Sequence, residues 1–308
     1  MAERALPTAP LPTIRDYVAY DPHRRTLGMN LHALDLAEWI EVDERLPHDL
    51  SEKRRLLHTR RDDVLAVLPA GYDGSRETLV LLAEHLPVRY PQLYERRNDH
   101  LHNRATGEEW DLALPTLHPL EIAARLVQED LCVMGKIEPD GEYVLTSASV
   151  CFPTRWNLSE KAGRSVNMIH EPVPGYTGSL AVPMNRFFDR LRVERPVWRT
   201  NWSLLDDPSL FQPNGHESAA PSDDINAHNA GERLWLRTER QTLRRLPASG
   251  DILFTIRIYV NALASMAEEP GRATQLAEAL QRLVSPMADY KGPTAIRQAA
   301  VAWLLNAG

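Results

Sequence analysis

Two strand-like runs joined by a turn signal constrain the fold of this chain most strongly. Residues 131–137 and 143–151 are rich in β-branched and apolar side chains and flank the tetrapeptide Glu-Pro-Asp-Gly at 138–141. Proline fixes φ and glycine permits a positive φ, so this tetrapeptide favours a tight turn between antiparallel strands. Three further strand-like runs follow at residues 197–205, 233–243 and 251–260. Five strands, mostly consecutive, predict an antiparallel sheet.

Helical patterns surround these strands. Apolar spacing and capping residues predict helices over residues 51–68, 75–86 and 119–128, and shorter ones over 158–163 and 182–191. Two apolar stripes predict further helices near the C-terminus: Leu276, Leu280, Leu283 and Val284, then Ile296, Ala300, Trp303 and Leu304. We therefore predict an α+β fold. Helices inserted between the second and third strands of a five-stranded antiparallel sheet are also the layout of a PAS-type domain.

Changes in composition suggest three parts. Residues 1–24 are rich in proline and predict an extended N-terminal arm, residues 25–262 form the main domain, and residues 263–308 form a C-terminal helical extension. Within the main domain, residues 212–230 are polar and predict a surface loop or lid.

Charge, cysteine content and missing motifs exclude several classes of function. A net charge of −7 over 308 residues argues against binding nucleic-acid phosphates. Two cysteines are too few for a disulfide scaffold or a four-cysteine zinc or iron–sulfur site, which favours a reducing cytoplasm. The sequence has no apolar run of about 20 residues for a membrane span, and its N-terminus has no apolar segment of a secretory signal. It also lacks the glycine-rich motifs that bind NAD(P)H or ATP.

Polar residues in the last two strands mark candidate sites. In the final strand Arg257 alternates with Thr255 and Tyr259, so it needs either a salt bridge, a solvated sheet face or an anionic ligand. In the preceding strand, alternation places Arg237 and Glu239 on one face, which is either solvated or a pocket. In a pocket, Glu239 could bind an ammonium group or transfer a proton.

Two further residues have alternative interpretations as metal ligands. His170, in NMIHEPVPGY, is either a hydrogen-bonded structural residue or a ligand. Cys151, at the end of a strand, is either a core thiol or a thiolate ligand of iron. His100 and His102 could flank a metal but lack an evident third ligand.

Long phrases of this sequence resemble one known family. They are GMNLHALDLAEWIEVD (28–43), YVLTSASVCFPTRWNLSEKAGRSVNMIHEPVP (143–174), NRFFDRLRVERPVWRTNWSLLDDPSLFQP (185–213) and RTERQTLRRLPASGDILFTIRIY (237–259). In collinear order, over roughly residues 25–260, they resemble the haem-dependent oxidative N-demethylase alpha-subunit family, which includes a dimethylamine monooxygenase subunit.

The resemblance implies haem b in an extended PAS-like domain. It also implies that a small secondary amine such as dimethylamine reacts with dioxygen, releasing formaldehyde and a primary amine. Electrons would come from NADPH through flavin and iron–sulfur centres on partner subunits. That division of labour agrees with the two cysteines and the missing nucleotide motifs. The alternatives are a non-catalytic haem-binding PAS-type sensor, although no fused kinase, cyclase or DNA-binding segment is visible, and an α+β protein without a cofactor.

Within this family reading, residue type and placement suggest individual roles. His170 is the expected iron ligand. Arg155, Arg237 and Arg257 are candidates for the haem propionates, whose carboxylates match a guanidinium. Glu239 and Tyr176 are candidates for contact with the substrate.

Overall fold

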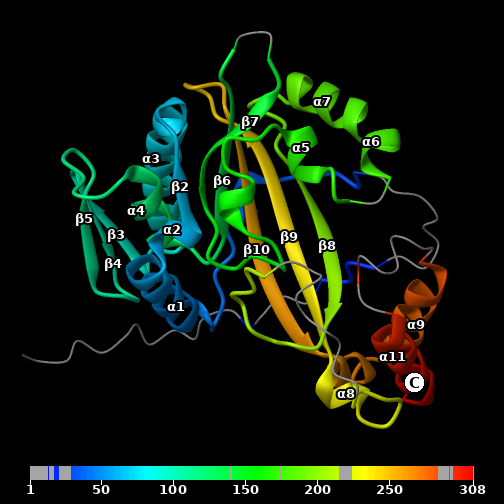
Figure 1. The fold of residues 1–308 in the computed structure, drawn as a ribbon. Helices are drawn as coiled ribbons and strands as arrows, with labels where there is room; N and C mark the ends of the chain where they lie inside the picture. Colours follow the sequence, from blue (N-terminus) through cyan, green and yellow to red (C-terminus); the bar gives the residue numbers. More distant parts are fainter. Residues whose placement is uncertain are drawn as a thin grey trace, which may run out of the picture.

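The strand-like runs of the sequence come together in one antiparallel sheet (Figure 1). The structure is a computed structural model, and it describes residues 13, 17–20, 29–138, 141–173, 175–214, 224–283, 291 and 294–307. The sheet has seven strands in the order β1-β8-β9-β10-β6-β7-β2. Their bounds are His32–Ala33 (β1), Leu65–Val67 (β2), Asp130–Lys136 (β6), Tyr143–Ser149 (β7), Val197–Leu205 (β8), Trp235–Arg245 (β9) and Ile252–Ala262 (β10).

Helices cover both faces of this sheet (Figure 1). On one face lie α1 (Leu46–Thr59), α2 (Arg61–Val64), α3 (Tyr72–Arg89) and α4 (Pro119–Leu126). On the other lie α5 (Val166–His170), α6 (Tyr176–Ser179) and α7 (Ala181–Arg190), all inserted between β7 and β8. The remaining helices, α8 (Ala230–Arg233), α9 (Arg272–Arg282) and α11 (Thr294–Ala307), pack together near one end of β8–β10. A small second sheet, β3 (Tyr94–Arg97), β4 (His100–Asn103) and β5 (Glu108–Asp111), flanks α1–α4.

Strand alternation directs apolar side chains to both faces of the sheet. Leu131 and Val133 of β6 pack with the leucines of α1, α3 and α4. Cys132 and Met134 of the same strand point the other way and pack with Phe188 of α7. Because both faces are covered, polar side chains near the middle of the sheet are shielded from bulk water and require partners.

The α+β class and the antiparallel sheet are confirmed, and the five predicted strands lie within two residues of the observed bounds. The predicted helix over residues 51–68 is wrong at both ends. It begins at Leu46 and ends at Thr59, and residues 65–67 form β2, which pairs with β7. The helix predicted to stop before Pro87 continues to Arg89, since this proline falls in the last turn, where few hydrogen bonds are lost.

The predictions about the N-terminal arm, the surface loop and the division into parts are not tested by the structure. Most of the N-terminal arm (residues 1–24) and residues 215–223 of the predicted 212–230 loop lie outside the described residues, and the division into three parts stays a prediction. Within the described ranges, no helix combines the length and apolar composition needed to cross a bilayer.

Candidate functional site

The sheet face on which α5–α7 pack, here called the α5–α7 face, carries Glu239 of β9. In the strand registers Glu239 lies between Asn201 of β8 and Ile258 of β10, so these three side chains share one face. Arg257 alternates with Ile258 along β10 and therefore belongs to the opposite face. The strand thus separates two of the predicted site residues.

Three side chains fix the Glu239 carboxylate. Thr154 Oγ1 donates to Oε1 at 2.8 Å, and Gln241 Nε2 and Asn201 Nδ2 donate to Oε2 at 2.8 and 3.4 Å. The half-buried carboxylate is an acceptor in all three bonds. An ionised carboxylate offers about four lone-pair positions. Glu239 can therefore accept one more donor, such as an ammonium N–H.

Arg237 lies beside Glu239 on β9, but its guanidinium is used within the chain. Its Nε donates to Thr154 Oγ1 at 3.0 Å, and its other nitrogens donate to the carbonyls of Phe152, Ser209 and Leu210 at 2.8–3.0 Å. The side chain is 1% exposed, and burial lowers its pKa to about 10. The N–H groups of Arg237 that were predicted to bind a haem carboxylate are therefore bonded to backbone carbonyls.

Arg155 also has a partner within the chain. Its guanidinium donates to Asp206 at 2.6 Å, and its backbone has a φ of 57°, in the left-handed region that side chains other than glycine rarely adopt. Its N–H donates to the carbonyl of Gln212, and the N–H of Gln212 donates to the carbonyl of Pro153. The 152–155 segment is thus held in a strained turn against Gln212.

His170 has the geometry of a potential metal ligand. Its Nδ1 lies 2.8 Å from the carbonyl oxygen of Val166, so Nδ1 carries the proton and Nε2 keeps a lone pair. The ring stacks on Tyr176 with centroids 4.9 Å apart and planes at 18°. Burial, with the nearby charges of Lys161 and Arg199, lowers the pKa of His170 and favours the neutral form that binds metals.

Tyr176 is itself enclosed at this position. Its side chain is 2% exposed, and burial raises its pKa to about 12. The hydroxyl lies 3.4 Å from Asn167 Oδ1. Tyr176 therefore contacts the expected iron ligand directly, whereas its predicted contact with the substrate stays a prediction.

Lys161 was missed by the sequence analysis. Its Nζ lies 4.2 Å from the centre of the Trp156 ring, and burial lowers its pKa while Glu239 and Cys132 act in the opposite direction. Among the described residues its ammonium has no ion pair or hydrogen bond. Its segment, NLSEKAG, is polar and was predicted only as part of a short helix, so no local signal marked this lysine.

The opposite face contains Arg257 in an ion-pair network. Its guanidinium lies 2.6 Å from Asp43 and 3.3 Å from Asp49, and all three side chains are buried. The salt-bridge alternative for Arg257 is therefore the one seen. Asp43 and Asp49 therefore serve as the carboxylate partners of Arg257, a role that was predicted for a haem propionate.

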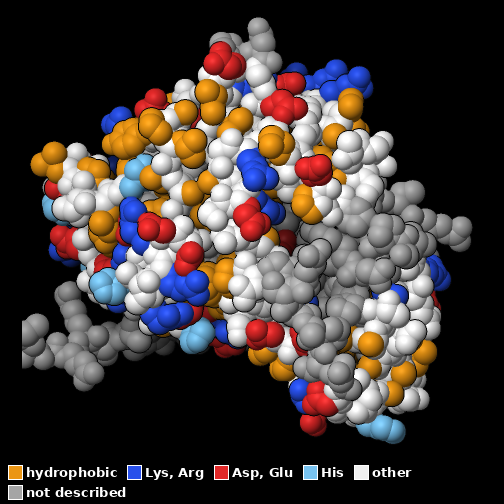
Figure 2. Space-filling model, in the orientation of Figure 1, with side chains coloured by type: hydrophobic (Ala, Val, Ile, Leu, Met, Phe, Trp, Pro, Cys, Tyr) orange, Lys and Arg blue, Asp and Glu red, His pale blue; other side chains and the backbone are white. Residues whose placement is uncertain are grey.

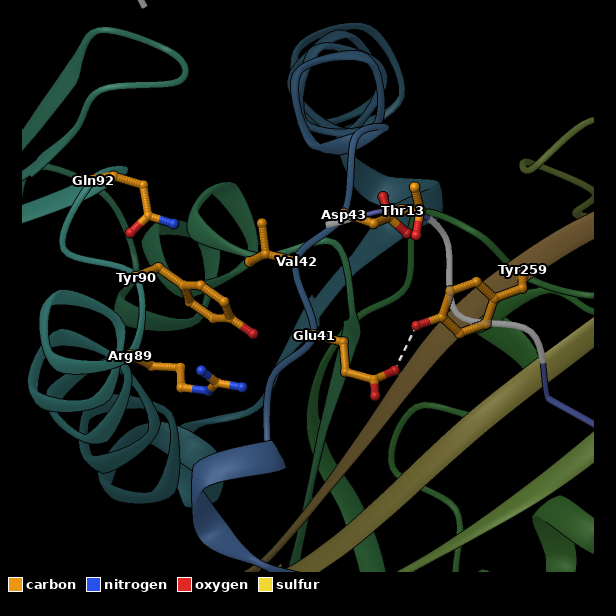
Figure 3. A pocket seen from close by; sticks show the side chains of 8 residues that line it. All are labelled: Thr13, Glu41, Val42, Asp43, Arg89, Tyr90, Gln92 and Tyr259. Carbon is orange, nitrogen blue, oxygen red and sulfur yellow. Dashed lines mark hydrogen bonds between the residues drawn. The ribbon is translucent and has the colours of Figure 1, made fainter. Parts of the chain in front are cut away.

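A small cavity of about 150 Å³ lies next to this network (Figure 3). Tyr259 donates to Glu41 across it, Tyr90 donates to the carbonyl of Ile40 at 2.7 Å, and Arg89 bonds to Glu38 at 2.9 Å. These groups that line the cavity are thus satisfied by the chain itself. The α5–α7 face, with its carboxylate still able to accept a bond, is the better candidate site.

The remaining metal candidates are weaker. The thiol of Cys151 is fully buried, and burial raises its pKa to about 12, as expected for a neutral core thiol. His100 pairs with Glu109 at 3.2 Å on the small sheet. In the described part of the chain, no three histidine, cysteine or acidic residues are grouped as a metal site.

The α5–α7 face fits haem in the chemistry of its side chains. It offers a neutral imidazole with Nε2 available, apolar side chains of Leu243, Phe254 and Phe188, and the Lys161 ammonium for a carboxylate. On the surface, by contrast, acidic and basic side chains intermingle over the face that Figure 2 shows, without one broad basic patch.

A comparison with protein families points in the same direction. A family model described as haem-dependent oxidative N-demethylase, alpha subunit-like, matches residues 30–301. The match covers both sheet faces, the 152–155 segment and all of α5–α7. The chain belongs to the haem-dependent oxidative N-demethylase alpha-subunit-like family.

Proposed function

We propose that this chain is the haem-containing, oxygen-activating subunit of an enzyme that demethylates a small secondary amine such as dimethylamine. The observation that carries the proposal is an acceptor-only carboxylate, Glu239, on the same sheet face as a neutral imidazole, His170, whose Nε2 has no hydrogen bond to any described residue. Lys161 interacts electrostatically with both residues. Its charge lowers the pKa of His170, and the charge of Glu239 acts to raise the pKa of Lys161. The insertion of α5–α7 between β7 and β8 supports the PAS-like arrangement.

The protein's part in this proposal is to bind and orient. Haem, when bound, supplies the oxidation of the methyl group by dioxygen. His170 Nε2 would ligate the iron, and stacked Tyr176 would hold the ring orientation. Lys161 would pair with a propionate, since an ammonium without an ion pair is costly to bury.

Glu239 would bind the protonated amine through its remaining acceptor position and could take up its proton. The balanced reaction uses one dioxygen, two electrons and two protons. One oxygen atom ends in formaldehyde and the other in water, with a primary amine as the second product. We infer that NADPH supplies the electrons through flavin and iron–sulfur centres of a partner reductase, in the cytoplasm.

The test is haem content followed by amine binding. We expect about one non-covalent haem b per chain by pyridine haemochrome assay after expression with added haem. Dimethylamine should shift the Soret band, and Glu239→Gln should weaken amine binding more than haem binding, because a neutral amide attracts a cation less than a carboxylate does. Folded protein that stays colourless with added haemin would overturn the proposal.

The sensor alternative predicts a different result. A haem-binding sensor would respond spectroscopically to a ligand but release no formaldehyde when supplied with a suitable reductase, NADPH and amine. Formaldehyde release under these conditions decides between the two functions.

A further inference from the structure

We propose that Thr154 is the positioning residue for the Glu239 carboxylate. Its importance for amine binding rests on the proposed function, whereas its effect on the orientation of Glu239 does not. The inference comes from the direction of two hydrogen bonds that meet at one hydroxyl group.

The donors and acceptors leave one arrangement of protons. Arg237 Nε can only donate, and it lies 3.0 Å from Thr154 Oγ1, so that oxygen accepts. A threonine hydroxyl has a single hydrogen. That hydrogen therefore points to Glu239 Oε1, 2.8 Å away. Arg237 thus sets the hydroxyl, and the hydroxyl sets one carboxylate oxygen.

The backbone that carries Thr154 is fixed independently. Asp130 of β6 accepts hydrogen bonds from the N–H groups of Cys151 and Phe152 at 2.8 and 3.0 Å. Arg237 holds the carbonyl of Phe152 on the other side. The strained residue Arg155 follows immediately, and such backbone strain persists only where surrounding contacts enforce it. Thr154 itself is 9% exposed, so water competes little for its hydroxyl.

These hydrogen bonds determine which acceptor position of the Glu239 carboxylate stays available to a further donor. Gln241 and Asn201 bind Oε2, and Thr154 binds Oε1. With both oxygens anchored, the remaining acceptor position keeps one direction. Without Thr154 the carboxylate is anchored through Oε2 alone and can rotate.

Two variants separate the contribution of the hydroxyl from that of the side-chain volume. Thr154→Val keeps the shape and removes the hydrogen bond, whereas Thr154→Ser keeps the hydroxyl. In crystal structures of the purified chain, we expect Glu239 to keep its orientation in Thr154→Ser and to turn away from residue 154 in Thr154→Val. Thr154→Ala removes the same hydroxyl if the valine variant does not fold.

Spectral titration of the haem-loaded protein gives the functional readout. Thr154→Val should raise the Kd for dimethylamine about tenfold, which corresponds to about 1.4 kcal/mol, and Thr154→Ser should stay within about twofold of the unaltered protein. Carbon monoxide is the control ligand, because it carries no charge for Glu239 to bind. Its affinity should not change.

Each outcome decides a separate question. An unchanged Glu239 orientation in Thr154→Val overturns the positioning role. Equal losses of carbon monoxide and amine affinity also overturn it, because they indicate general damage to the site. If the unaltered protein binds haem but shows no response to amines, the proposed function fails, while the crystal structures still decide the role of Thr154.

Discussion

The two ring nitrogens of His170 have separate roles in the fold. Nδ1 is committed to the carbonyl of Val166, and this bond leaves Nε2 as the only nitrogen able to bind iron. Loss of an axial ligand changes the electronic state of the iron. We therefore expect His170→Ala to remove or strongly change the haem absorption spectrum, measured at equal protein concentration.

Cys151→Ala is the matched control. The thiol is fully buried and its raised pKa keeps it protonated, so its removal should leave the Soret band in place. An unchanged Soret band in folded His170→Ala would assign the iron to another ligand. A thiolate-type spectrum of the reduced carbon monoxide complex would identify Cys151.

At the scale of single residues, the sequence indicates which side chains need a polar partner but not which groups provide it. Alternation correctly predicted that Arg257 lies on a sheet face where an unpaired charge would be costly. Its partners, Asp43 and Asp49, lie more than 200 residues earlier in the chain, and no local pattern connects them. Lys161 gave no signal for the same reason, since the ring and charges around it come from the fold.

Strand β9 connects the candidate site to the 152–155 segment through one side chain. Arg237 binds carbonyls of Phe152, Ser209 and Leu210, and none of these requires a cofactor. Arg237→Met should remove the donor from these buried and part-buried carbonyls and lower the free energy of unfolding of the haem-free chain by about 3 kcal/mol. Urea denaturation of the haem-free proteins measures this.

The opposite outcome would favour the role predicted from sequence. If Arg237 mainly serves a propionate, Arg237→Met should unfold at the same urea concentration as the unaltered haem-free chain and lose only haem affinity. Arg233→Met is a suitable control, because Arg233 pairs with Asp224 at an exposed position outside this network.

Elements with strong local signals were predictable, and the others depend on distant contacts. The long strands alternate and end at recognisable turns, such as the 246–251 turn with Gly250 at φ 77°. The three-residue strand β2 was read as part of a helix because its apolar residues continue a helical stripe, and only pairing with β7 makes it a strand. Helices α5 and α6 are too short to show periodicity, although α5 carries His170, the proposed iron ligand.

Over the whole molecule, the half-buried His85 should make stability depend on pH. His85 of α3 packs edge-on against Trp39, and burial with the charges of Arg244 and Arg89 lowers its pKa to about 4. Its ordinary pKa is about 6.5, so below that pH the unfolded chain takes up the proton more readily. The contribution of neutral His85 to the free energy of unfolding is therefore fully present above about pH 6.5 and is lost as the pH falls toward about 4.

Replacing this histidine tests that dependence. With allowance for its partial exposure, His85→Phe should gain about 1 kcal/mol relative to the unaltered chain between pH 7 and pH 5. Urea unfolding at both pH values measures the difference. Exposed His58 of α1 provides the control His58→Gln. Parallel curves for His85→Phe and the unaltered chain would exclude this source of acid sensitivity.

The proposed division of labour between subunits can be tested on the whole molecule. Both cysteines are buried with raised pKa values, and the sequence has no nicotinamide-binding motif. We expect no formaldehyde from NADPH and dimethylamine with this chain alone, and turnover after a flavin and iron–sulfur reductase is added. Turnover without the reductase would contradict the split enzyme.

The strand order has a further consequence for how the protein is made. Strand β10 is the last of the sheet in sequence, yet it lies between β6 and β9, and its register joins Met134 to Ile252 and Asp130 to Ile256. Ribosomes add about 5–20 residues per second, so β6 waits on the order of ten seconds for its neighbour. During synthesis the β6–β7 and β8–β9 pairs remain separate, each with an open edge that can bind other nascent chains. Efficient production of this protein should therefore depend on chaperones that shield these edges until residue 262 has emerged.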